Sequence, residues 1–96
     1  MKGKQRAYLR GEANSMNVML QVGKDGITEA VIEQVEETID SKELIKIRVL
    51  DNSLYNTKDA AYEIAEAVDA EVIQVIGSVI VLFRQDEDNS QYNLPS

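Results

Sequence analysis

The residues best suited to chemistry lie in the segment Gly23-Lys24-Asp25-Gly26-Ile27-Thr28, which follows a short apolar run, Val18 to Val22. Glycine adopts positive φ angles readily and lets the backbone approach a ligand closely. A helix that begins just after the turn adds unpaired N–H groups and the positive end of its dipole. This G-x-x-G corner therefore predicts a phosphate-binding turn, with an ordinary strand-to-helix connection as the alternative.

The sequence contains neither cysteine nor histidine. Their absence excludes Ser-His-Asp and Cys-His catalysis, disulfides, thiolate metal sites and the usual zinc sites. We therefore expect no enzyme, no cofactor and no metal site. One face of the helix predicted after Thr28 is acidic, but like charges on a single helix rarely hold a divalent cation. We interpret these carboxylates as a solvated face or a docking surface for a basic protein: Glu29, Glu33, Glu36, Glu37 and Asp40.

The charge is distributed unevenly along the 96 residues, whose net charge is −7. Residues 1–28 carry five basic and two acidic side chains, a balance of +3, whereas residues 29–96 carry five basic and fifteen acidic side chains, a balance of −10. Local fields, rather than the total charge, decide which ligand approaches which face. The net charge of −7 therefore does not exclude an anionic partner, which could bind where the basic side chains are concentrated.

Seven elements must position these residues, and hydrophobic periodicity with capping signals predicts them in the order helix, strand, helix, strand, helix, strand, strand. The fold class is α+β, a two-layer α-β-α-β-α-β-β arrangement with a four-stranded mixed sheet and the helices on one face. The hairpin strands, joined by Gly77-Ser78, are expected at the centre of the sheet, and their pairing adds an antiparallel edge. The expected elements are helix 2–13, strand Val18–Val22, a helix from the cap Thr28 to about Ser41, strand Leu44–Leu50, a turn-rich connection from Asp51 to Asn56, a helix capped by Asn56 or Thr57 through about Val68, and strands Val72–Ile76 and Val79–Phe83.

Periodicity also assigns faces to the predicted elements. In the second strand Lys46 and Arg48 point away from the core together, about 6–7 Å apart, which suits contacts to successive phosphates. On the first helix Lys2, Arg6 and Arg10 recur every four residues and line one strip. Both sets are also compatible with plain solvation. The expected core residues are Tyr8, Leu9, Ala13, Val31, Ile32, Val35, Ile39, Ile45, Ile47, Val49, Ala61, Ile64, Ala65 and Val68.

We expect one domain over residues 1–84 and an acidic, polar, partly disordered tail over residues 85–96. Tyr92, Leu94 and Pro95 are apolar enough to dock back on the body. The N-terminus lacks the apolar region of a signal peptide, and no apolar run approaches the ~20 residues of a membrane span. A cytoplasmic protein without a membrane partner is the expectation.

Several blocks taken together resemble the bacterial YhbY-type RNA-binding proteins, which are stand-alone versions of the CRM domain (chloroplast RNA splicing and ribosome maturation). The blocks cover nearly the whole chain in the family's order. They are Gly3-Lys4-Gln5-Arg6-x-x-Leu9-Arg10, Gln21-Val22-Gly23-Lys24-x-Gly26-Ile27-Thr28, Glu43 to Leu50, Ile73 to Gly77, Ile80 to Arg84 and Leu94-Pro95.

The resemblance implies an α+β fold similar to the C-terminal domain of a bacterial translation initiation factor. It also implies an RNA-binding factor associated with assembly of the large ribosomal subunit, with precursor ribosomal RNA and pre-large-subunit particles as partners. Family members use the G-x-x-G loop and the basic surface around it. Carried over to this chain, the RNA-binding residues are Gly23, Lys24, Asp25 and Gly26 in the loop, with Lys4, Arg6, Arg10, Lys46, Arg48 and Arg84 around it.

A second function remains open from the sequence. The −10 balance after residue 28 would also suit a protein-interaction module that binds basic ribosomal proteins through its acidic face.

Overall fold

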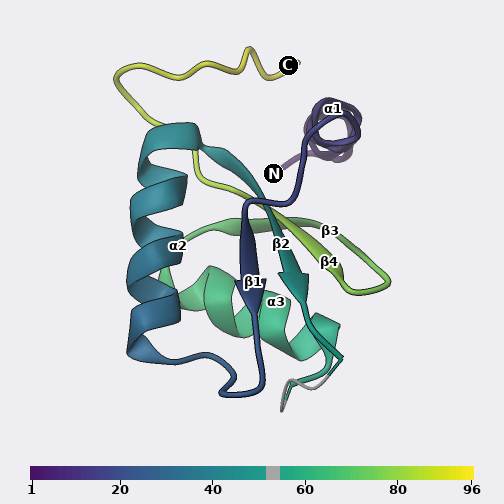
Figure 1. The fold of residues 1–96 in the computed structure, drawn as a ribbon. Helices are drawn as coiled ribbons and strands as arrows, with labels where there is room; N and C mark the ends of the chain where they lie inside the picture. The colour runs from purple at the N-terminus through teal and green to yellow at the C-terminus, as the bar shows by residue number, and fades with distance from the viewer. Residues whose placement is uncertain (52–54) are drawn as a thin grey trace.

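The computed structural model describes residues 1–51 and 55–96, so residues 52–54 of the predicted connection lie outside the described part. The predicted order of elements is confirmed (Figure 1). The helices and strands are α1 (Gly3–Ala13), β1 (Leu20–Val22), α2 (Glu29–Lys42), β2 (Leu44–Val49), α3 (Thr57–Ala67), β3 (Glu71–Ile76) and β4 (Val79–Phe83).

Helix starts follow the predicted caps. The side chain of Thr28 accepts a hydrogen bond from the N–H of Val31 at 3.2 Å, and that of Asn56 accepts one from Asp59 at 2.8 Å. Each cap satisfies one of the N–H groups that a helix start leaves without a partner. Strand β1 is shorter than predicted because it begins at Leu20 rather than at Val18, although the N–H of Met19 already donates to the carbonyl oxygen of Lys46 at 2.9 Å.

The strands of the four-stranded mixed sheet lie in the order β1-β2-β4-β3. Strand β1 is parallel to β2, whereas β4 is antiparallel to both β2 and β3. The expectation that the hairpin strands share the centre is therefore wrong for β3, which is an edge strand, and β4 lies between β2 and β3. The reason is burial: Ile80 and Leu82 face one side of β4, Val81 and Phe83 face the other, and all four are buried.

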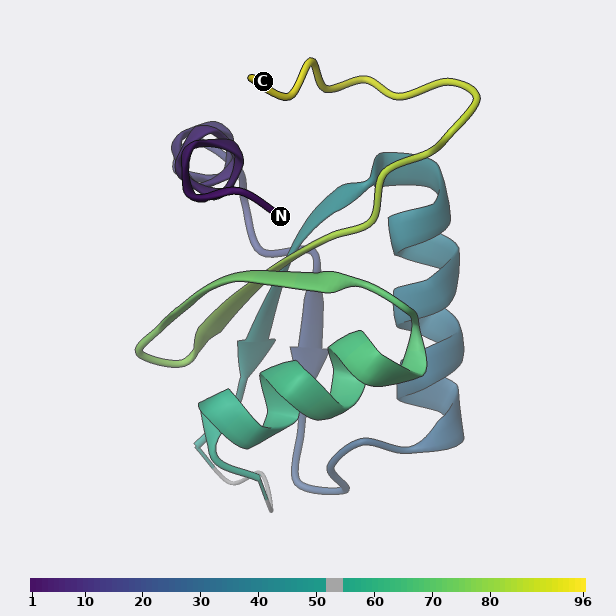
Figure 2. The same cartoon turned by 180° about the vertical axis from the view of Figure 1, so that it is seen from behind.

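Helices α2 and α3 cover one face of the sheet, and α3 crosses the strands when the molecule is seen from behind (Figure 2). The main core lies between these helices and the sheet, as the predicted apolar stripes require. Val31 and Ile32 are half-buried at its margin. Its buried members are Val22, Val35, Ile39, Ile45, Ile47, Val49, Ala60, Ala61, Ile64, Ala65, Val68, Ile80 and Leu82.

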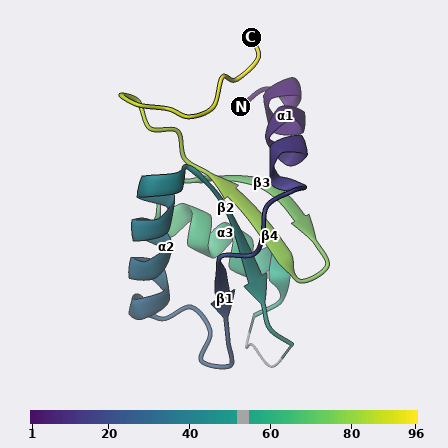
Figure 3. The same ribbon diagram turned by 45° about the horizontal axis from the view of Figure 1, so that its top comes forward.

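Helix α1 corrects the expectation that all helices share one face, because it packs against the opposite face of the sheet (Figure 3). Leu9 and Ala13 of α1 contact a second buried cluster that contains Leu44, Ile73, Val81 and Phe83. This buried cluster lies at one end of the face, since the next residues of β2 that point the same way are Lys46 and Arg48. The helix therefore covers this cluster and leaves the other end of the face, which carries both polar and apolar side chains, open.

The segment after β4 contacts the body at several points. Glu43, a buried residue with a φ of 65°, accepts hydrogen bonds through its carboxylate from the backbone N–H of Asp86 at 3.0 Å, the hydroxyl of Ser90 at 2.6 Å and the backbone N–H of Gln91 at 2.6 Å. The ring of Tyr92 packs edge-on against Phe83, with the ring centroids 5.8 Å apart.

Sequence reasoning missed the role of Glu43. The domain division at residue 84 and the partial disorder of residues 85–96 stay predictions.

Candidate functional site

The G-x-x-G corner forms a tight turn at the end of β1 that lies farthest from α1 (Figures 1 and 3). The backbone N–H of Gly26 donates to the carbonyl oxygen of Gly23 at 3.0 Å, and Gly26 has a positive φ of 73°. Lys24 and Asp25 at the tip are exposed. The turn therefore presents one cation and one carboxylate to solvent, close to the start of α2.

The two glycines of this turn have different surroundings. A Cβ atom built on Gly26 would lie 2.7 Å from Cε2 of Tyr55, whereas one built on Gly23 would meet nothing within 4 Å. The negative charge of Glu63, with partial burial and a hydrogen bond to that carboxylate, raises the pKa of Tyr55. Tyr55 thus connects the turn to α3. Sequence reasoning missed this contact because no local pattern relates residue 55 to residue 26.

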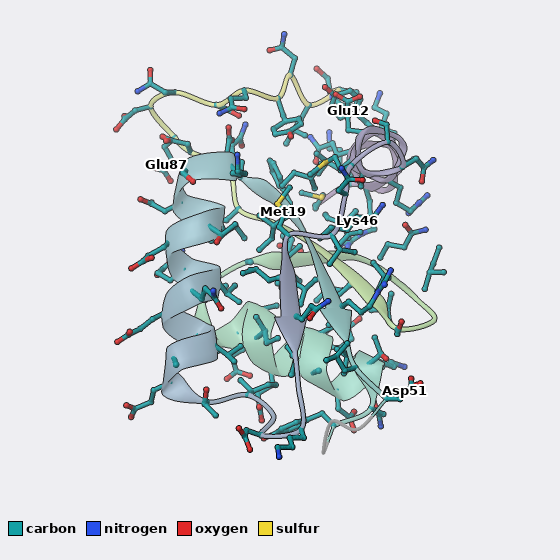
Figure 4. The ribbon with its side chains drawn as sticks, viewed as in Figure 1. Glu12, Met19, Lys46, Asp51 and Glu87 are labelled. Atoms are coloured by element: carbon teal, nitrogen blue, oxygen red, sulfur yellow. The ribbon has the colours of Figure 1, made fainter. Side chains whose placement is uncertain are left out.

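Three of the predicted RNA-binding cations are engaged within the protein. The ammonium of Lys46 donates to the carbonyl oxygens of Ala13 and Met16 at 2.8 and 3.1 Å, and Figure 4 shows Lys46 next to α1. The guanidinium of Arg6 donates to the carbonyl oxygen of Val72 and lies 3.6 Å from the carboxylate of Glu71. These contacts hold α1 against the sheet.

Arg84 is the third engaged cation. Its guanidinium donates to the carboxylate of Glu36, to that of Asp40 at 3.4 Å, and to the carbonyl oxygen of Val68 at 2.8 Å. It therefore joins the acidic face of α2 to the end of α3 and offsets part of that face's charge.

The other four predicted cations do not form one cluster. Lys4 is exposed and Arg10 half-buried on α1, at one end of the molecule, whereas Lys24 lies on the turn at the other end. Arg48 lies between these two groups, because it follows Lys46 by two residues along β2 toward the turn. Of the cations that the sequence predicted to bind RNA, Arg48 is thus the one that lies on a strand and is exposed.

Arg48 belongs to a part of the sheet that α1 leaves uncovered. Gln21 lies beside it on β1, Val79 lies beside it on β4, and Ile76 of β3 lies opposite Val79. Gln74 extends this area toward α1. We call these five residues the open sheet surface. Sequence reasoning identified Arg48 but not its neighbours, because they come together only through the strand order.

The acidic face of α2 is exposed at Glu29, Glu33 and Glu37. Within residues 1–51 and 55–96 no three carboxylates are grouped closely enough to hold a metal ion. No helix in this same part of the chain is long and apolar enough to cross a membrane.

Comparisons with known proteins agree on one family. The model of the CRS1 / YhbY (CRM) domain matches residues 1–84. Probable RNA-binding protein YqeI of Bacillus subtilis is 35% identical over 95 residues, which covers 99% of each chain. Probable RNA-binding protein MJ0652 of Methanocaldococcus jannaschii is 38% identical over 94 residues, or 96% of this chain and 69% of that protein.

A solved structure supports the same assignment. The solution structure of the hypothetical protein SAV1595 from Staphylococcus aureus superposes with a TM-score of 0.84 and 41% sequence identity, covering 99% of each chain. The resemblance found in the sequence blocks is thereby confirmed, as is the α+β fold. The chain belongs to the CRS1/YhbY (CRM) domain family.

Proposed function

We propose that this protein binds RNA without catalysing a reaction and that the Gly23–Gly26 turn is part of the contact surface. The observation that carries the proposal is the turn itself, which exposes Lys24 at the end of β1 just before α2 begins. Backbone N–H groups at such a corner, together with a lysine, suit a phosphate oxygen. The names of the relatives YqeI and MJ0652 describe RNA-binding proteins, which supports the same partner.

The remaining predicted residues have two roles in this proposal. Lys4, Arg10 and Arg48 contact the RNA backbone with Lys24, whereas Arg6, Lys46 and Arg84 hold the elements that present them. Phosphate contacts of this kind fix the register and orientation of a nucleic acid and carry little sequence information. The RNA would then be recognised mainly by shape and backbone.

The cellular role that we propose is cytoplasmic assembly of the large ribosomal subunit, with precursor ribosomal RNA as the ligand. The family resemblance supports this role. Its test is cosedimentation of the tagged protein with large-subunit precursors at low salt and its release at high salt. A protein that stays with free ribosomal proteins after nuclease treatment would contradict RNA-mediated association.

That outcome would favour a second candidate function, in which basic ribosomal proteins bind the acidic face of α2. The exposed carboxylates of Glu29, Glu33 and Glu37 support it. Replacing these three residues by glutamine would abolish such binding, whereas it would leave the binding of purified RNA unchanged or slightly stronger.

The direct test of RNA binding uses fluorescence anisotropy with a fragment of precursor ribosomal RNA. Lys24→Ala should weaken binding severalfold, because the variant loses one phosphate contact. Lys42→Ala is the matched control, since Lys42 is an exposed lysine in the last turn of α2. Equal affinities of the Lys24→Ala variant and the wild type would remove the turn from the proposed site.

A further inference from the structure

The open sheet surface contains a straight row of four side chains that crosses all four strands. Gln21 pairs with Arg48, Arg48 pairs with Val79, and Val79 pairs with Ile76. Directly opposite residues of neighbouring strands point to the same face, so these side chains project together from the sheet. With strands about 4.8 Å apart, the row is on the order of 14 Å long.

The row is accessible along most of its length. Gln21 and Arg48 are exposed, Val79 is half-buried, and Ile76 keeps 61% of its surface exposed. A hollow of about 200 Å³ adjoins the row near α1 and is lined by Asn14, Lys46, Gln74, Ile76, Val79 and Val81. Pockets for whole small molecules measure about 300–1,000 Å³. The hollow is therefore suited to one part of a larger ligand.

The charge of this surface is opposite to that of the protein as a whole. Its ionisable side chains are Arg48 and, at the margin, Lys46. The nearest acidic position on the same face of the strands is Glu71, at the other end of β3, where its carboxylate lies 3.6 Å from Arg6. The helices on the other side carry most of the exposed carboxylates. An anionic ligand is consequently favoured on this face and repelled from the opposite one.

The side chains of the row favour single-stranded RNA over double-stranded RNA as the ligand. A double helix offers mainly phosphates and 2′-hydroxyl groups to a protein, whereas an unpaired strand also exposes the planes and edges of its bases. Ile76 and Val79 provide apolar contact for base or ribose surfaces. Arg48 and Gln21 provide hydrogen-bonding groups for base edges or phosphates. Apolar and polar groups that alternate along one row fit the unpaired strand better.

We propose that a single-stranded segment of RNA crosses the open sheet surface from Ile76 over Arg48 to Gln21 and continues to the turn at Gly23. The inference rests on the proposed function and adds to it the path and the unpaired state of the RNA. The continuity of the path follows from the chain, because Gln21 lies on β1 and Gly23 is the first residue after the end of this strand. With aliphatic rather than aromatic side chains in the row, each base is held less tightly than by a stacking platform.

The test compares a labelled oligouridylate of about 12 nucleotides with a blunt RNA duplex of the same length. Binding of the full chain to each is measured by anisotropy. Ile76→Glu places a carboxylate in the row and should weaken binding of the single strand about tenfold or more. Arg48→Ala should weaken it about three- to tenfold.

Two matched controls accompany these variants. Tyr62→Glu adds the same charge at a side chain that is 57% exposed on α3, close to the 61% of Ile76. Lys42→Ala removes one positive charge at the end of α2. Both controls should retain the affinity of the wild type within about twofold. Amide shifts in NMR spectra should change at Gln21, Arg48, Ile76 and Val79 on addition of the single strand.

The outcomes separate this inference from the proposed function. If the wild type binds neither of these RNAs nor the fragment of precursor ribosomal RNA, the proposed function fails, and this inference fails with it. If the wild type binds only that fragment, this inference alone fails. If the wild type binds the single strand but Ile76→Glu binds equally well, or Tyr62→Glu weakens binding as much, the path over the sheet is wrong and RNA binding stands. Tighter binding of the duplex than of the single strand would also overturn the inference.

Discussion

The ring of Tyr55 occupies the space where a side chain at position 26 would begin, because a Cβ atom on Gly26 would lie 2.7 Å from Cε2 of that ring. The positive φ of 73° at Gly26 adds a second reason for glycine at this position. The two glycines of the turn therefore have separable roles. Gly26 is required by the fold, whereas Gly23 borders open space and is available to a ligand.

Gly26→Ala should destabilise the protein by roughly 2–4 kcal/mol, since strain at positive φ and contact with Tyr55 both oppose a methyl group there. Gly23→Ala should change stability by less than about 1 kcal/mol and weaken RNA binding. Urea unfolding of both variants measures the difference. A double variant with Tyr55→Ala should recover part of the loss caused by Gly26→Ala; full additivity would contradict the contact as its cause.

Lys46 and Arg48 should respond differently to the same substitution. Lys46→Met removes the charged hydrogen bonds to the carbonyl oxygens of Ala13 and Met16, so the free energy of unfolding should fall by about 1–3 kcal/mol. Arg48→Met replaces an exposed side chain, so the free energy of unfolding should stay within about 0.5 kcal/mol of the wild-type value while RNA binding weakens. Thermal unfolding and anisotropy together check the pair. The reverse pattern would assign Lys46 to the ligand and Arg48 to the fold.

Glu43 should make stability depend on pH. Burial on its own raises the pKa of this carboxyl, but the hydrogen bonds from Ser90, Gln91 and Asp86 together outweigh it and hold the pKa below its ordinary value of 4.5. Because the folded pKa is the lower one, the stabilisation is present above about pH 4.5 and is lost as the pH falls through the folded value.

Glu43→Gln should lower the melting temperature at neutral pH and reduce the loss of stability on acidification. Glu87→Gln, at an exposed position in the same segment, is the control and should match the wild type. Melting curves between pH 3 and 7, about the range over which carboxyls titrate, measure both variants. Identical pH dependence in wild type and Glu43→Gln would contradict the role of this carboxylate.

Local signals were enough to predict the order of the elements. Thr28 and Asn56 are capping residues at the expected helix starts, and the alternation Ile45, Ile47, Val49 against Lys46 and Arg48 fixes the faces of β2. The strand order was harder to predict, because the insertion of β4 depends on the burial of both its faces against distant elements. The position of α1 likewise follows from an apolar area that exists only once Leu44 and Phe83 are side by side.

The candidate site shows the same division. The turn could be predicted because its residues are contiguous in sequence, and each cation could be identified by type. What the sequence could not show is which cations the fold itself uses. Arg6 reaches Val72, Lys46 reaches Ala13 and Arg84 reaches Glu36, all across long separations in sequence. These contacts give three of the predicted cations a role in holding the fold together, and the RNA-binding role of all the predicted cations stays a prediction.

The salt dependence of RNA binding by the wild type and the Arg48→Ala variant tests the central claim most directly. If Lys4, Arg10, Lys24 and Arg48 are the phosphate contacts, log Kd for a single strand should rise with log salt concentration with a slope of about 2–3, and Arg48→Ala should lower the slope by about 0.7. An affinity that does not change with salt, or equal slopes for the two proteins, would contradict RNA binding through the turn and the open sheet surface.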